Sequence, residues 1–137
     1  MRFVDTNVLL YAVSTHEAET AKAERARTLL TGRDLRLSAQ VLQEFYVQAT
    51  RSSRRDALSH EEAYELVLTF LRFPVQTITA ALVLAATVTR DRFGISYWDA
   101  AVIEAARASG CDVVLSEDLD EGTDYDGVNV ENPFWGL

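Results

Sequence analysis

The sequence predicts a single α/β domain with three layers, in which helices cover both faces of a short, mainly parallel central sheet. Its length of 137 residues is in the usual range for one domain, and no linker, repeat or low-complexity segment divides it. A composition of 48% apolar and 25% charged residues is typical of a globular protein. Short β-like runs alternate with longer helix-like runs, which is typical of parallel strands covered by helices.

Five short runs of largely apolar residues are the predicted strands. They lie at residues 2–5, 35–37, 75–77, 111–115 and 127–130. The carboxyl ends of parallel strands meet at one edge of a sheet, and ligands of such sheets bind at that edge. We therefore expect functional residues just after these strands.

The longer segments have helical periodicity and clear end signals. The predicted helices lie at residues 6–13, 17–31, 39–50, 60–72, 79–93 and 97–108. Ser59 and Glu62 have the spacing of a capping box, and Ser38 and Ser96 are suited to cap the helices that follow them. Glycines follow three of the helices and predict their ends.

The net charge of −8 comes entirely from the end of the chain. Residues 1–107 carry 13 acidic and 13 basic side chains, whereas residues 108–137 carry eight acids and no Lys or Arg. A protein that binds nucleic acid mainly through charge would be basic overall. Any nucleic-acid contact is therefore expected to be local, through arginines near a site or through a metal ion.

The sequence favours a soluble, cytoplasmic protein with no membrane partner. No apolar run approaches the roughly 20 residues of a membrane helix. An acid at position 5 interrupts the apolar start of the chain, which is unlike a signal peptide. Cys111 is the one cysteine, so no internal disulfide can form.

Four acids lie at the predicted carboxyl edge of the sheet or on helices that can reach it. Asp5 ends the first strand, and Asp118 follows the fourth. Asp99 and Glu44 lie in the first two turns of their helices. Each also has a structural interpretation: Asp5 and Asp99 can cap helices. Asp118 lies in an acid-rich turn, and the helix can turn Glu44 outward.

Convergence of these acids would require a cation. Carboxylates that meet repel one another, and a bound divalent ion removes that cost. Sites built from oxygen alone suit Mg²⁺ or Mn²⁺. One cysteine and two histidines, His16 and His60, cannot build a zinc site.

Two other acid-based chemistries fit the sequence less well. A phosphatase with Asp5 as its nucleophile would need an acid two residues further on, where the chain has Asn7. A receiver-like domain, which binds Mg²⁺ and is phosphorylated on an Asp, would need a lysine near the site. Lys22 is the only lysine, and it lies on a predicted helix that we expect to be far from any strand end.

The four acids lie in four short motifs: FVDTNVLLY at 3–11, LQEFY at 42–46, SYWDAAV at 96–102 and LSEDL at 115–119. In this order and at these separations, the motifs resemble those of the PIN domain family. More narrowly, they are similar to those of VapC-type toxin ribonucleases of type II toxin–antitoxin systems. The ending GVNVENPF at 127–134 is also similar, so the resemblance covers nearly the whole chain.

The resemblance implies one PIN-like domain over residues 1–137 that hydrolyses RNA phosphodiester bonds as a Mg²⁺- or Mn²⁺-dependent endoribonuclease. Asp5, Asp99 and Asp118 would be metal ligands. Glu44 would bind the ion through water or orient the attacking water. Such an ion binds a phosphate oxygen and lowers the pKa of a bound water. The alternative is a catalytically inactive PIN-like module that binds RNA or a partner.

Neighbouring residues are expected to support this site. Asn7 can hydrogen-bond a carboxylate near Asp5, and Thr6 can cap the following helix. Ser116 can contact Asp5 or a metal-bound water. Asp120 is either a further acid of the fourth motif or a plain turn residue.

RNA contacts and protein partners complete the prediction. Four residues are candidates for RNA contact: Arg51, Arg54, Arg55 and Trp98. The alternative is that the three arginines are plain solvated surface residues and that Trp98 packs against the sheet. The resemblance implies a cognate antitoxin protein and a homodimer as partners. Four apolar residues either line a groove for the antitoxin or belong to the core: Tyr11, Leu42, Tyr46 and Phe70.

Overall fold

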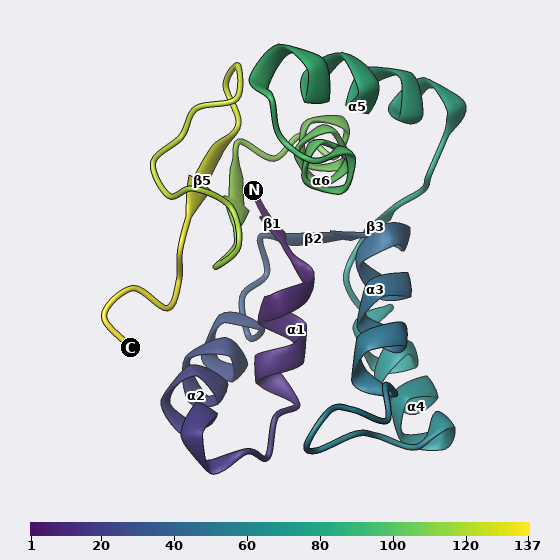
Figure 1. Cartoon of the computed structure of the whole chain (residues 1–137), viewed down its shortest axis with the longest axis vertical. Coiled ribbons are helices and arrows are strands. Elements are labelled where there is room, and N and C mark those ends of the chain that lie inside the picture. Colours follow the sequence, from purple (N-terminus) through teal and green to yellow (C-terminus); the bar gives the residue numbers. More distant parts are fainter.

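Five short strands form one parallel sheet in the computed structural model, which describes residues 1–137 (Figure 1). The strand order is β3-β2-β1-β4-β5. The strands are β1 (Arg2–Val4), β2 (Leu35–Ser38), β3 (Val75–Gln76), β4 (Val113–Leu115) and β5 (Asn129–Glu131). In the central register, Phe3 of β1 is paired with Arg36 of β2 and with Val114 of β4. All carboxyl ends therefore lie at the same edge.

Six α-helices cover the two faces of the sheet, which confirms the predicted three layers. They are α1 (Thr6–Ala12), α2 (Thr20–Leu29), α3 (Ala39–Ala49), α4 (His60–Phe70), α5 (Ala80–Phe93) and α6 (Tyr97–Ala108). Figure 1 shows α5 and α6 above the sheet, and α1, α2, α3 and α4 below it. None of these helices has the length and apolar character needed to cross a membrane.

The order of the strands reverses at β1. This strand pairs with β2 on one side and with β4 on the other. The loops that follow β1 and β4 therefore leave the same edge side by side, at the topological switch point where ligands bind in sheets of this kind.

Buried side chains from the sheet and both helical layers form the core. The largest fully buried ones include Phe3, Leu37, Phe45, Ile103 and Val114. Burial of each such side chain contributes roughly 1.5–3 kcal/mol. The same packing fixes α3 and α6, the helices that carry Glu44 and Asp99, on opposite faces of the sheet.

Three predicted helix starts are confirmed in detail. Ser59 and Glu62 form both hydrogen bonds of a capping box at the start of α4. The hydroxyls of Ser38 and Ser96 cap α3 and α6 by accepting a backbone N–H from the first turn.

The helix predicted over residues 17–31 is divided. A 3₁₀ turn covers Glu17–Glu19, and α2 begins only at Thr20. The Nδ1 atom of His16 accepts the backbone N–H of Ala18 at 3.2 Å, which caps this short turn separately. The sequence pattern did not reveal this cap, because His is not among the preferred N-cap residues.

The strand predicted over residues 111–115 is also shorter than expected, since β4 begins at Val113. Gly110 adopts a left-handed conformation with φ of 76°. The backbone N–H of Cys111 donates back to the carbonyl of Ala106 at 2.9 Å. Residues 110 and 111 therefore complete the end of α6 instead of extending the strand.

Candidate active site

A small cavity opens at the carboxyl edge of the sheet, where the loops after β1 and β4 meet α3 and α6. Its volume is about 80 Å³. Four carboxylates from four separate parts of the chain line it: Asp5, Glu44, Asp99 and Asp118. We call it the carboxylate cavity. The structure thus brings together all four acids that the sequence singled out.

Asp5 is the most buried of the four, with 6% of its surface exposed. It is the N-cap of α1, because its Oδ1 accepts the Thr6 backbone N–H at 2.8 Å, while its Oδ2 accepts the Ser116 hydroxyl at 2.7 Å. The pKa of Asp5 is raised to about 6, mainly by burial. The two hydrogen bonds oppose this rise, and the charges of Asp118 and Glu44 add to it. Asp5 therefore caps a helix and lines the cavity at once.

Glu44 is half-buried and held at both carboxylate oxygens. The Thr6 hydroxyl donates to Oε2 at 3.0 Å, and the Gln40 amide donates to Oε1 at 2.8 Å. The expectation that Thr6 caps α1 is wrong, because the Asp5 side chain does so and the Thr6 hydroxyl is used on Glu44. These two donors direct Glu44 into the cavity instead of outward.

Asp99 contributes its backbone to a helix cap and its carboxylate to the cavity. The Ser96 hydroxyl accepts the Asp99 backbone N–H at 3.1 Å, but no return bond from the Ser96 N–H completes a capping box. Burial raises the pKa of Asp99, the Ser96 hydroxyl opposes the rise, and the charges of Asp118 and Glu44 add to it. The capping interpretation therefore does not account for this carboxylate.

Asn7 links the loops after β1 and β4. Its Nδ2 atom donates to Asp118 Oδ2 at 3.1 Å and to Ser116 Oγ at 3.3 Å, and it lies 3.5 Å from Asp5 Oδ2. Its Oδ1 atom accepts the backbone N–H of Glu117 at 3.2 Å. The exposed carboxylate of Asp118 is therefore held beside the buried carboxylate of Asp5 by one amide side chain.

No basic side chain compensates the four acids. The ion pairs of the chain all join other residues. As the side chains stand, no three acidic, His or Cys residues are grouped to hold one metal ion, and the Asn7 amide lies between two of the acids. The donor set still fits a hard divalent cation, because it consists of oxygen atoms and carries uncompensated negative charge. Metal ligation by these residues stays a prediction.

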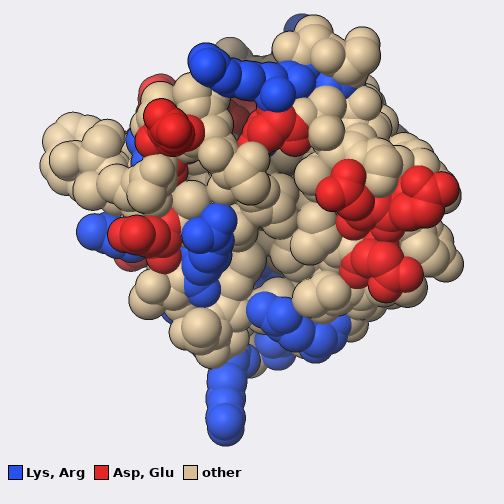
Figure 2. Space-filling view, turned by 90° about the horizontal axis from the view of Figure 1, so that it is seen from below, with Lys and Arg blue, Asp and Glu red and all other residues tan.

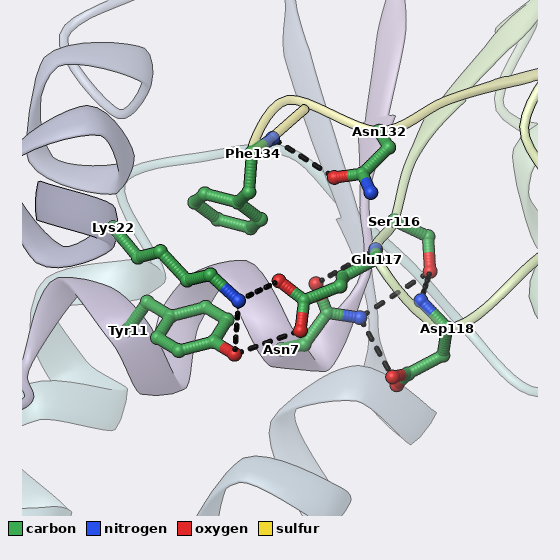
Figure 3. A network of polar contacts seen from close by, with 8 residues as sticks. All are labelled: Asn7, Tyr11, Lys22, Ser116, Glu117, Asp118, Asn132 and Phe134. Atoms are coloured by element: carbon green, nitrogen blue, oxygen red, sulfur yellow. Dashed lines mark hydrogen bonds and ion pairs between the residues drawn. The ribbon is translucent and has the colours of Figure 1, made fainter. Parts of the chain in front are cut away.

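A partly buried ion pair behind the cavity was not predicted. Figure 3 shows Lys22 of α2 beside Glu117 in the loop after β4, with 2.8 Å between Nζ and Oε2. The Tyr11 hydroxyl donates to Oε1 of Glu117 at 2.8 Å. The expectation that Lys22 lies far from any strand end is wrong. Because α2 packs on α1, Lys22 lies beside the loop that follows β4. Lys22 and Glu117 are 95 residues apart in the chain, so no local sequence pattern predicts their ion pair.

The four predicted RNA contacts lie in different places. Arg51 and Trp98 line a second cavity next to the carboxylate cavity. Arg54 forms an ion pair with Asp56 at 3.1 Å, and Arg55 lines a different cavity. The structure thus separates one arginine of the group from the other two.

Surface charge is divided into small groups. Figure 2 shows acidic and basic side chains in several small groups, some of them next to one another, and no continuous basic surface on this face. Asp120 is exposed and does not line the carboxylate cavity. This arrangement agrees with nucleic-acid contacts that are local instead of spread over the surface.

The fold and the cavity define a class of protein: a three-layer α/β domain with an acidic site at the carboxyl edge of its parallel sheet. The PIN domain family matches residues 2–122, so the chain belongs to the PIN domain family. This confirms the family that the four motifs resemble.

Solved structures with the same fold come from toxin–antitoxin systems. A toxin–antitoxin complex from Klebsiella pneumoniae has a TM-score of 0.71 and 15% identity, with 98% of each chain covered. VapC20 of Mycobacterium tuberculosis, described as a sarcin–ricin loop cleaving toxin, has a TM-score of 0.66 and 22% identity over 86% of this chain and 92% of that chain. DNA-bound VapBC from Salmonella typhimurium has a TM-score of 0.68 and 20% identity over 96% and 97%. At these identities the likeness shows the fold. A search of curated proteins gave no match.

Proposed function

We propose that this protein is a Mg²⁺- or Mn²⁺-dependent endoribonuclease and the toxin of a toxin–antitoxin pair. The observation that carries the proposal is the convergence of four carboxylates without a basic partner on one cavity at the switch point of the sheet. Membership of the PIN domain family supports it. So does the fold shared with VapC20, whose description is that of an RNA-cleaving toxin.

Each acid has a distinct part in this reaction. Asp5, Asp99 and Asp118 would hold the ion, and Glu44 would orient the attacking water. The bound ion would lower the pKa of that water and neutralise the phosphate. Since Thr6 and Gln40 each bond one oxygen of Glu44, its carboxylate keeps one direction when RNA enters.

The decisive experiment is cleavage of total RNA and purified tRNA by the antitoxin-free protein with Mg²⁺, Mn²⁺ or EDTA. The variant is Asp99→Asn, which keeps the backbone N–H that Ser96 uses to cap α6. The matched control is Asp120→Asn, because this acid lies outside the cavity. We expect discrete, EDTA-sensitive cuts by the wild type and the control, and none by Asp99→Asn.

The other outcomes have definite meanings. A wild-type protein that makes no cuts under any condition would favour the inactive binding module. Equal cutting by the wild type and Asp99→Asn would remove Asp99 from the proposed site.

We further propose that a cognate antitoxin binds an open, mostly apolar groove between α3 and α4. Six residues line this groove, five of them apolar or aromatic: Leu42, Gln43, Tyr46, Val47, Tyr64 and Val67. Phe70 is only 3% exposed and belongs to the core, while Tyr11 packs edge to face on Phe134 with 4.8 Å between ring centroids. Tyr46→Asp should therefore abolish co-purification with the antitoxin while leaving RNA cleavage intact.

A homodimer is also part of the proposal. Leu84 and Val88 are one turn apart on α5 and are 67% and 66% exposed. Exposed apolar side chains in such a row are suited to self-association. Light scattering should show a dimer for the wild type and a monomer for the double variant Leu84→Asp, Val88→Asp.

A further inference from the structure

A second, wider cavity opens directly beside the carboxylate cavity. Its volume is about 510 Å³, which is within the usual range of about 300–1,000 Å³ for small-molecule sites. Glu44, Gln48 and Trp98 line both cavities, so the two adjoin. A molecule in the wider cavity would therefore lie next to Glu44, one of the four carboxylates.

The position of this cavity is fixed by one buried side chain. Gln40 is 6% exposed, and its Nε2 atom donates to Glu44 Oε1 at 2.8 Å and to the Trp98 carbonyl at 3.3 Å. These bonds join α3 to the first turn of α6. The backbone of Trp98, from which the indole extends to line this cavity, is therefore held at a set place relative to Glu44.

Polar side chains around this cavity have unused hydrogen-bonding groups. Gln43, Gln48 and Arg51 line it, and their side chains form no hydrogen bond or ion pair with the protein. Two arginines elsewhere differ in this respect, since Arg54 pairs with Asp56 and Arg107 pairs with Glu104. Two free amides and one free guanidinium thus face a cavity next to an acidic site.

Trp98 adds a flat apolar surface to the same cavity. Its side chain is 63% exposed, and its one aromatic contact is an edge-to-face contact with Tyr97 at 5.1 Å between centroids. An exposed indole is a platform on which a nucleobase stacks. Carboxamides both donate and accept hydrogen bonds, as base edges do.

We propose that the wider cavity binds the nucleotide adjacent to the cleaved phosphodiester bond. The base stacks on Trp98, Gln43 and Gln48 hydrogen-bond its edge, and Arg51 binds the neighbouring phosphate. The ligand is single-stranded RNA, since only an unpaired base can enter and stack. This inference rests on the proposed ribonuclease function and identifies the place where that enzyme selects its cleavage site.

The first test measures stacking without cleavage. The chain has two tryptophans, so Trp135→Phe makes Trp98 the sole tryptophan, which is excited selectively above the absorption of tyrosine. Combined with Asp99→Asn, which prevents turnover, this protein is titrated with hexamers of A, C or U and with inorganic phosphate, all in Mg²⁺. We expect saturable quenching by at least one RNA hexamer and none by phosphate. Absence of quenching by every hexamer would overturn the proposal and leave the cavity to a protein partner.

The second test uses cleavage. Stacking on an aromatic side chain contributes about 1–3 kcal/mol, so Trp98→Ala should lower kcat/KM by roughly 5- to 150-fold, while Trp98→Phe keeps most of the activity. Trp135→Ala is the matched control, because Trp135 is 76% exposed and lines neither cavity. A Trp98→Ala protein that cleaves like the wild type, at the same positions, would refute the subsite while the ribonuclease function stands.

Two polar variants separate the phosphate contact from the base contact. Arg51→Met should lower the slope of log affinity against log salt by about 1, whereas Arg55→Met, on a different cavity, should not. Gln43→Ala should change which base is preferred next to the cut. If the wild type cleaves no RNA at all, the proposed function fails, and the fluorescence titration still decides whether RNA binds beside Trp98.

Discussion

Glu117 and Asp118 are neighbours in the chain, yet their carboxylates lie in two electrostatically different regions. Glu117 is 2.8 Å from the Lys22 ammonium and accepts a hydrogen bond from the Tyr11 hydroxyl. Asp118 faces the carboxylate cavity, where its one side-chain donor is the Asn7 amide at 3.1 Å. The same contrast holds more widely, because Glu104 pairs with Arg107 while none of the four cavity acids has a cation.

This contrast separates acids that stabilise the fold from acids that require a charge from outside. A buried negative charge costs free energy unless it is paired. The raised pKa of Asp5 shows that cost within the cavity. Neutralising a cavity acid should therefore stabilise the metal-free protein, whereas neutralising a paired acid should destabilise it.

The largest effect is expected on catalysis. Asp5→Asn should lower the rate of RNA cleavage by roughly a thousandfold or more. A catalytic ion stabilises the transition state by several kcal/mol, and each loss of about 1.4 kcal/mol lowers the rate tenfold. Initial rates on one RNA substrate measure this, and far-UV circular dichroism checks that the variant is folded. A folded variant that keeps a tenth of the wild-type rate would contradict the role of Asp5.

The same variant should be more stable than the wild type when metal is absent. The pKa of Asp5 is about 6 when folded and near 3.8 when unfolded, so the folded state binds more protons between these values. Protonation of Asp5 therefore adds to the free energy of unfolding. This stabilisation is fully present below about pH 4 and is lost as the pH rises through 6. Urea unfolding in EDTA should therefore find Asp5→Asn about 3 kcal/mol more stable above pH 7, and equal near pH 4. A difference that does not change with pH would show that burial is not the cause.

Removal of a compensating cation should lower the free energy of unfolding, whereas neutralising Asp5 should raise it. Lys22→Met leaves Glu117 partly buried without its partner, and should destabilise the protein by about 1–2 kcal/mol. It should also slow cleavage by roughly tenfold, because Glu117 holds Asn7 through its backbone N–H and Asn7 holds Asp118. Thermal melts and cleavage rates measure both effects, and Lys22→Arg should restore most of each. Unchanged cleavage would show that the ion pair does not position Asp118.

The smallest effect is expected on the far side of α6. Glu104 is 8% exposed, accepts the Thr89 hydroxyl at 2.8 Å and pairs with Arg107. Glu104→Gln should destabilise the protein by about 1 kcal/mol and leave cleavage unchanged. Urea unfolding tests the sign directly, because a stabilised Glu104→Gln protein would remove the distinction between paired and cavity acids.

Much of the fold followed from interactions between residues close in the chain. Ser59 and Glu62 are three residues apart, so their capping box was predictable from spacing. Strand positions and the parallel sheet followed from the alternation of short and long apolar segments. The separate cap at His16 was not predictable, since the residue type gives no such signal.

The candidate site divides in the same way. Residue type and position after a strand identified Asp5 and Asp118, and the contact between Ser116 and Asp5 was among the expected ones. The hydrogen bond from Gln40 to Glu44 was not expected, although it spans only one helical turn. A glutamine on a helix can bond several different neighbours, so its residue type does not indicate which one it bonds.

Residue types, helix ends and strand runs could be identified from the chain alone, because capping and periodicity act over a few residues. Folding decided which acids are paired and which arginine lies beside the cavity. Lys22 and Glu117 meet across 95 positions, and Arg51 lines the wider cavity while Arg54 pairs with Asp56. Burial and charge pairing depend on distances in space, and only the packing of helices on the sheet sets those distances.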